Sequence, residues 1–128
     1  MKWEITDSNP HETKFMVEIV RGLNSVKGVW LSETPLIGQT TYVELDINAP
    51  IEDLDFTEYC HEEYSASLNI NTNELIGMIE EVDTEDNLHY LRLSSDCLIM
   101  LESKGTNLKE GGFYKISIPI ELVGITRC

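Results

Sequence analysis

The sequence predicts an all-β fold, an antiparallel sandwich or partly open barrel of about eight or nine short strands with little helix. Three observations predict it. Short segments alternate between apolar and polar residues, with the period of two that a half-buried strand requires. Turn-forming residues separate these segments at intervals of about 8–12 residues, which is typical of all-β domains. No segment shows the longer periodicity of an amphipathic helix.

The length of 128 residues predicts one domain, residues 1–128, with a single hydrophobic core. The hydrophobic share of 41% and the charged share of 25% are both ordinary for a folded domain. No internal repeat or low-complexity segment divides the chain.

Three strands are expected in the first quarter of the chain, at Lys2–Thr6, Lys14–Arg21 and Ser25–Glu33. The run Asp7–Pro10 (Asp-Ser-Asn-Pro) predicts a turn after the first of them, because each of these residue types favours turns. Gly28 lies inside the third strand, where a glycine indicates a bulge or a bend.

Thr40–Asn48 has the clearest alternation in the chain and predicts a strand with one buried face. Its inward side chains are expected to be Thr41, Val43, Leu45 and Ile47. Its outward side chains are expected to be Tyr42, Glu44 and Asp46, so the exposed face is aromatic and acidic.

Ala49–Glu63 is the least regular segment and is expected to be a loop with a short helical turn. Pro50 ends the preceding strand. A long loop on a rigid β scaffold is a common place for function. Six acids crowd this loop: Glu52, Asp53, Asp55, Glu58, Glu62 and Glu63. The strand after it is expected to direct four side chains inward: Tyr64, Ala66, Leu68 and Ile70.

Four further strands are expected, at Glu74–Val82, Leu88–Leu93, Cys97–Glu102 and Phe113–Ile125. Pro119 in the last of them indicates an edge position or a bulge. The connections are a tight turn, an acidic hairpin tip and a polar loop, at Asn71–Asn73, Asp83–Asn87 and Lys104–Gly112 respectively. One face of the last strand is expected to carry Tyr114, Ile116, Ile118 and Ile120.

The net charge of −14 comes entirely from the segment Gly28–Leu91. This segment has fifteen acids and no Lys or Arg, whereas the remainder has eight acids and nine bases. A charge of this sign repels nucleic acid and anionic membranes, and it favours a basic partner. Solubility alone is the alternative explanation of the charge.

The three cysteines, Cys60, Cys97 and Cys128, are odd in number and lack metal-binding spacing. They argue against a disulfide scaffold and, with no apolar leader at the N-terminus, favour a cytoplasmic location. The longest apolar run, Cys97–Leu101, is too short to span a membrane.

Two short clusters contain residue types that bind metals. The run Cys60–Glu63 (Cys-His-Glu-Glu) offers three kinds of ligand, but adjacent residues on an extended chain point to opposite sides. Asp83, Glu85 and Asn87 have the spacing of a calcium loop. An EF-hand also requires Gly at its sixth position and Glu at its twelfth, which are Leu and Ser here. Without a phosphate-binding loop or a nucleophile motif either, the sequence predicts no enzyme, no metal and no cofactor, and only a looser cation site between acidic loops stays open.

The small size, the acidic segment Gly28–Leu91 and the acidic loop Glu52–Glu63 together resemble the immunity proteins of bacterial contact-dependent or polymorphic toxin systems. The resemblance implies a non-enzymatic protein that covers the active site of a cognate toxin domain, often a basic nuclease. The last third also resembles a small barrel of the OB type, through Gly77, Leu91–Leu93 and Gly112–Ile116.

The partner is expected to be a basic protein rather than a nucleic acid or a membrane, and the oligomeric state stays open. Its binding surface is expected to combine acids with aromatic anchors, because a few desolvated side chains supply most of the energy of binding. The expected residues are Tyr42, Glu44, Asp46, Glu52, Asp53, Asp55, Phe56, Glu58, Tyr59, Glu62 and Glu63.

Three other functions stay open from the sequence. A small-ligand or carbohydrate-binding β domain would use aromatic side chains such as Trp30 and Tyr42. An enzyme with paired carboxylates would need two of the many acids in one cleft. An accessory subunit of a larger assembly would expose a large apolar patch.

Overall fold

The computed structural model describes residues 2–128, and its architecture is all-β, as the sequence predicts. The described residues contain twelve strands, more than the eight or nine expected, and two single-turn 3-10 helices. The strands are β1 (Trp3–His11), β2 (Lys14–Arg21), β3 (Asn24–Trp30), β4 (Thr40–Thr41), β5 (Val43–Ile47), β6 (Asp55–Glu58), β7 (Ser65–Asn69), β8 (Thr72–Asp83), β9 (Leu88–Ser94), β10 (Cys97–Glu102), β11 (Phe113–Pro119) and β12 (Val123–Arg127). The 3-10 helices are η1 (Ile51–Asp53) and η2 (Ile120–Leu122), and no helix of residues 2–128 is long and apolar enough to cross a membrane.

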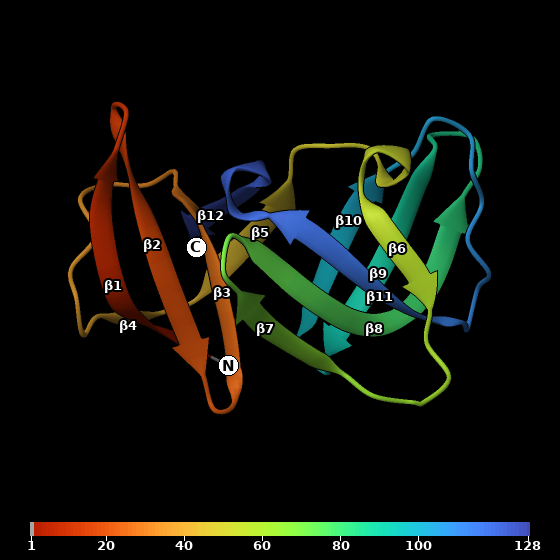
Figure 1. Ribbon diagram of the computed structural model, residues 1–128, viewed down its shortest axis with the longest axis horizontal. Coiled ribbons are helices and arrows are strands. Elements are labelled where there is room, and N and C mark those ends of the chain that lie inside the picture. The colour runs from red at the N-terminus through yellow and green to blue at the C-terminus, as the bar shows by residue number, and fades with distance from the viewer. Residues whose placement is uncertain (1) are drawn as a thin grey trace.

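The strands form two sheets (Figure 1). The first has the order β4-β1-β2-β3-β12-β5, in which only the β3–β12 pair is parallel. The second has the order β10-β9-β8-β11-β6, and β7 also pairs with β8. The registers place β7 and β9 one after the other along the same side of β8, because β11 pairs with the opposite side. β5 and β10 are therefore edge strands of different sheets, and they lie next to each other.

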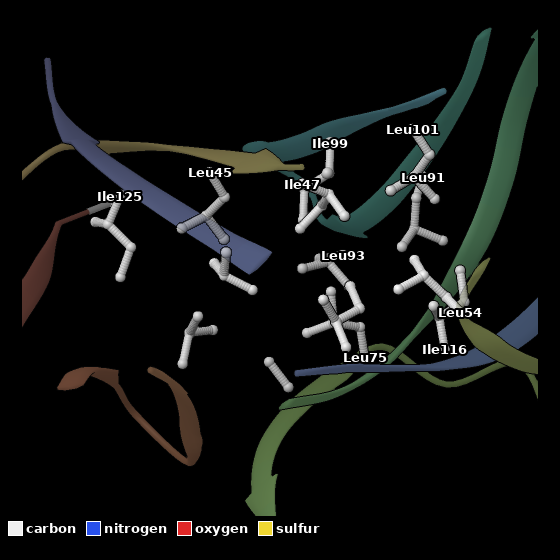
Figure 2. Close-up of a cluster of buried hydrophobic side chains, with 14 of the residues drawn as sticks. Leu45, Ile47, Leu54, Leu75, Leu91, Leu93, Ile99, Leu101, Ile116 and Ile125 are labelled. Carbon is white, nitrogen blue, oxygen red and sulfur yellow. The ribbon is translucent and has the colours of Figure 1, made fainter. Parts of the chain in front are cut away.

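One hydrophobic core joins the two sheets. Figure 2 shows Leu45 and Ile47 of the first sheet close to Ile99 and Leu93 of the second. The alternation predicted for Thr40–Asn48 is confirmed, since Leu45 and Ile47 are buried while Glu44, Asp46 and Tyr42 are exposed. Alternate side chains of a strand point to opposite faces, so the same pattern that builds the core also presents these acids to solvent.

A buried arginine links the two sheets. Arg21 at the end of β2 donates a hydrogen bond of 2.6 Å to Ser94 Oγ and forms an ion pair of 3.0 Å with Asp96, both at the β9–β10 turn. Its guanidinium also lies over the Trp3 ring, 4.9 Å from the centroid. Nearby, the Asn24 side chain accepts a hydrogen bond of 3.0 Å from the backbone N–H of Ala66 in β7. The sheets therefore meet through polar contacts as well as through the core.

The predicted turn at Asp7–Pro10 is wrong, because β1 continues through it to His11. The hairpin with β2 turns at Glu12 and Thr13 instead. Beyond Ile5, no strand of the described chain pairs with the outer side of β1. Pro10 has no backbone N–H, and on this unpaired side no hydrogen bond to a neighbouring strand is required of it. Tertiary pairing thus outweighs the local preference of these residues for a turn.

Two other segments differ from the prediction because the chain changes its pairing partner. Phe113–Ile125 is not one strand, since at Pro119 the chain leaves the second sheet, passes through η2 and enters the first sheet as β12. Thr40–Asn48 is interrupted at Tyr42, where β4 pairs with β1 and β5 pairs with β12. Gly28 marks no bulge; a Cβ there would lie 2.6 Å from the Val123 carbonyl oxygen, so it permits close approach of η2 and β12.

The strand expected at Tyr64–Ile70 is shorter than predicted. β7 spans Ser65–Asn69, and the hairpin turn lies at Ile70 and Asn71 rather than at Asn71–Asn73. Tyr64 and Ile70 are consequently exposed and not directed inward, and Ile70 has a φ of 57°. Asn73 lies within β8 and is fully buried.

Candidate functional site

The structure divides the expected partner-binding residues between two sheets. Tyr42, Glu44 and Asp46 lie on or beside β5, at the edge of the first sheet. Asp55, Phe56 and Glu58 lie on β6, at the far edge of the second sheet, and Tyr59, Glu62 and Glu63 follow it. In the second sheet, the strand that lies beside β5 is β10, and β9, β8 and β11 separate β10 from β6 along that sheet. The acids of β5 and those of β6 therefore lie at different sheet edges (Figure 1).

Glu52 of η1 is used within the fold. Its carboxylate accepts hydrogen bonds from the backbone N–H groups of Lys104, at 2.8 Å, and Thr106, at 2.9 Å. Partial burial raises the pKa of a carboxyl, but these donors outweigh it and lower the pKa of Glu52 to about 2. The neighbouring Asp53 forms an ion pair of 3.0 Å with the Lys104 side chain. Both acids therefore fasten the loop after β10 to η1.

The predicted loop at Ala49–Glu63 contains a strand, because Asp55–Glu58 pairs with β11 as β6. Phe56 is half-buried and packs against the core, whereas Asp55, Glu58, Glu62 and Glu63 are exposed. Tyr59 Oη donates a hydrogen bond of 2.8 Å to Glu63, which raises the pKa of Tyr59. This edge thus offers exposed carboxylates, but its aromatic rings are already engaged with the chain.

Residues 2–128 contain no group of three or more His, Cys, Asp and Glu side chains that could hold a metal ion. Cys60 and His61 are both exposed. The aromatic pair Trp30 and Tyr42 builds no common platform, because Trp30 is buried and donates its indole N–H to the Glu33 carbonyl while Tyr42 is exposed near Lys2.

His89 on β9 is fully buried, and its Nε2 accepts a hydrogen bond of 2.9 Å from the backbone N–H of Leu108. Burial lowers the pKa of His89, and the negative charge of Glu52 opposes that shift. This hydrogen bond connects His89 to Leu108, and it therefore helps to hold the loop after β10 in place.

Among the residues within strands of the second sheet, the most exposed large apolar side chains lie on the outer face of the β9–β10 hairpin. In the register of this pair, Leu98, Met100 and Glu102 stand opposite Arg92, Tyr90 and Leu88. Residues directly opposite in an antiparallel pair share one face. Leu88, Tyr90, Leu98 and Met100 therefore form one apolar strip. Leu98 is 45% exposed and Met100 is 52% exposed, while the intervening Ile99 is buried.

Sequence reasoning missed this strip. The run Cys97–Leu101 is apolar at every position, and a continuous apolar run is typical of a strand buried on both faces. The missing information was the tertiary arrangement, which leaves the outer face of the β9–β10 hairpin exposed while its inner face packs in the core. The sequence carried no separate signal for the strip, because Leu98 and Met100 are as apolar as the buried Ile99 and Leu101 with which they alternate.

Carboxylates border the apolar strip. On one side, β8 places Glu81 opposite Tyr90 and Asp83 opposite Leu88. On the other side, a recess of about 230 Å³ separates β10 from β5. It is lined by Leu31, Asp46, Ile47, Asn48, Leu88, Met100 and Glu102. Asp46, one of the residues expected in the binding surface, therefore lies beside this strip.

The charge of this face is not balanced locally. Its one base, Arg92, forms an ion pair of 2.8 Å with Glu80. Of the fifteen acids of Gly28–Leu91, only Asp53, Glu74 and Glu80 form ion pairs within residues 2–128.

Comparisons of this chain with protein-family models, with curated proteins and with solved structures find no match.

Proposed function

We propose that this chain is a non-enzymatic binding protein whose acidic surface engages a basic protein partner. The observation that carries the proposal is the excess of exposed carboxylates without a cationic neighbour in Gly28–Leu91. Such a field attracts a basic protein and increases its association rate, up to about 10⁸–10⁹ M⁻¹s⁻¹ at low salt. Within the acidic segment, Asp55, Glu58 and Glu62 are exposed on an edge strand and the loop after it, where they contribute to this field.

The specific form of the proposal is an immunity protein that neutralises a cognate toxin domain. A nuclease binds phosphate groups through Lys and Arg, so an acidic protein surface competes for the same side chains. The resemblance in size and charge pattern supports this form, and so does the supply of exposed carboxylates.

The test uses the product of the gene immediately upstream in the host genome, chosen if its C-terminal domain is basic. Co-expression should restore growth of cells that produce this domain, and calorimetry should show a complex that weakens as salt is raised, because salt screens exposed charges. A neighbouring basic domain that neither binds the protein nor loses its toxicity would refute the immunity role.

A second candidate is an accessory subunit of a larger assembly. The exposed Leu98 and Met100 favour it, because a contiguous apolar patch indicates a protein interface. The effect of salt separates the two functions. An assembly held mainly by apolar contact keeps its affinity as salt rises, whereas binding to a basic partner weakens.

A further inference from the structure

In the strip formed by Leu88, Tyr90, Leu98 and Met100, the last two residues are exposed and the first two are half-buried, although the reverse side of the strip forms part of the core. Leu91, Ile99 and Leu101 point from the same two strands into the core, where they are at most 1% exposed. β10 ends the order of the second sheet, and no further strand of the described chain pairs with its outer edge. Burial of Leu98 and Met100 by a partner would therefore remove apolar surface from water without disturbing the core.

The border of the strip determines which occupant fits. Glu81 and Asp83 lie along β8, while Glu102 and Asp46 lie toward β5. Arg92, the base that residues 2–128 place on this face of the hairpin, is paired with Glu80. A second copy of this chain would bring like charges together around the same strip, and anionic surfaces would be repelled in the same way.

We infer that the outer face of the β9–β10 hairpin is a docking surface for an apolar protrusion of a basic protein, flanked by Lys and Arg side chains. This inference rests on the proposed function and locates its contact. Leu98 and Met100 are the anchors, and the recess beside Leu31 receives part of the partner's side chains. The bordering carboxylates favour a partner with basic residues around its apolar protrusion, and they slow the binding of other partners.

The test uses a defined probe, a synthetic peptide of alternating Lys and Leu, compared with a peptide of alternating Lys and Ser of equal charge. The L98S/M100S variant removes two exposed anchors, and L23S/I70S is the matched control, because Leu23 and Ile70 are exposed apolar residues at turns and do not belong to the strip. We expect the Lys–Leu peptide to bind L98S/M100S at least ~10-fold more weakly than wild type and the control unchanged. Amide chemical shifts should change at Leu88–Arg92 and Leu98–Glu102, and the Lys–Ser peptide should bind weakly.

Equal binding of the Lys–Leu peptide to wild type and L98S/M100S would overturn the inference. So would shift changes confined to Asp55–Glu63, or self-association through this face in sedimentation experiments. A cognate basic domain that binds wild type and L98S/M100S alike would refute the docking surface and leave the proposed function intact. The cognate domain could bind neither wild type nor L98S/M100S while the Lys–Leu peptide still changes the chemical shifts of the strip. In that case only the proposed function fails.

Discussion

The side-chain amide of Asn73 pairs with both backbone groups of Lys27, and this contact joins the two sheets. Asn73 Oδ1 accepts a hydrogen bond of 2.8 Å from the Lys27 N–H, and Asn73 Nδ2 donates one of 2.7 Å to the Lys27 carbonyl. The amide makes the two hydrogen bonds that a residue of a neighbouring strand would make with Lys27, and it thereby connects β3 to the start of β8. Asn73 is fully buried, so neither Lys27 group finds a ready substitute in water.

Replacing this amide should destabilise the fold. We expect N73A to lower the free energy of unfolding by about 2–4 kcal/mol, because it leaves a backbone donor and an acceptor unpaired at the sheet junction. Urea denaturation measures the change. N71A, in the exposed hairpin turn, is the matched control and should stay close to wild type. An N73A protein as stable as N71A would show that water replaces the amide.

His89 should make stability depend on pH in the mildly acidic range. Its folded pKa lies below the ordinary value of 6.5, so the unfolded state binds the proton first. Stability should therefore be constant above that value and fall as the pH drops below it, with a slope approaching about 1.4 kcal/mol per pH unit.

The variant H89Q tests the source of this slope. A glutamine retains an acceptor for the Leu108 N–H but does not titrate, so thermal denaturation between pH 7 and pH 5 should lose most of its pH dependence. H61Q removes an exposed histidine and should retain the wild-type slope. Equal slopes in wild type and H89Q would contradict the assignment.

Glu52 should hold the loop after β10 in place. The variant E52Q keeps the size of the side chain but removes the charge and one of the two acceptor oxygens. We expect the amide protons of Lys104 and Thr106 to exchange at least ~10-fold faster, because the charged acceptor they share is replaced by a single neutral oxygen. The folded pKa of about 2 lies below the ordinary value of 4.5, so wild type should lose this contribution as the pH falls from 4.5 toward 2.

Hydrogen exchange followed by NMR measures this effect. E62Q supplies the control, since Glu62 is exposed in the same acidic segment and accepts no hydrogen bond from this loop. Unchanged exchange at Lys104 and Thr106 in E52Q would show that other contacts hold the loop.

The exposed acids of the segment Asp55–Glu62 should affect association more than dissociation. In D55N/E58Q/E62Q, the association rate of the Lys–Leu peptide should fall by up to ~10-fold at low salt, with little change in the dissociation rate. Stopped-flow fluorescence measures both rates. The control E4Q/E12Q/E121Q removes equal charge from outside Gly28–Leu91 and should slow association less. Identical effects in both triples would mean that net charge alone acts.

Sequence reasoning predicted the fold correctly where apolar and polar side chains alternate clearly along a strand. The alternation through Val43, Leu45 and Ile47 identified the buried face correctly, and so did Tyr114, Ile116 and Ile118. It failed where pairing decided the outcome. Pro119 looked like a local irregularity of one strand, but it is the point at which the chain passes between sheets. Asp55–Glu58 has little strand character by itself and becomes a strand by pairing with β11.

The same limit applied to the candidate surface. Composition located the charge in Gly28–Leu91, and the outward direction of Glu44 and Asp46 was correct. The sequence held no information on which face of the β9–β10 hairpin stays uncovered, so the exposure of Leu98 and Met100 was not predictable. It also could not show that Glu52 accepts hydrogen bonds from residues more than fifty positions later.

The passage of the chain at Pro119 has a consequence for synthesis on the ribosome. β12 lies between β3 and β5, so those two strands have no common neighbour until residues 123–127 have emerged. All strands of the second sheet precede this point in the chain. The nascent protein therefore carries two open strand edges through most of its translation, when edges are most prone to wrong pairing. Charged side chains on an open strand disfavour pairing with other chains, and Glu44 and Asp46 place two such charges on β5.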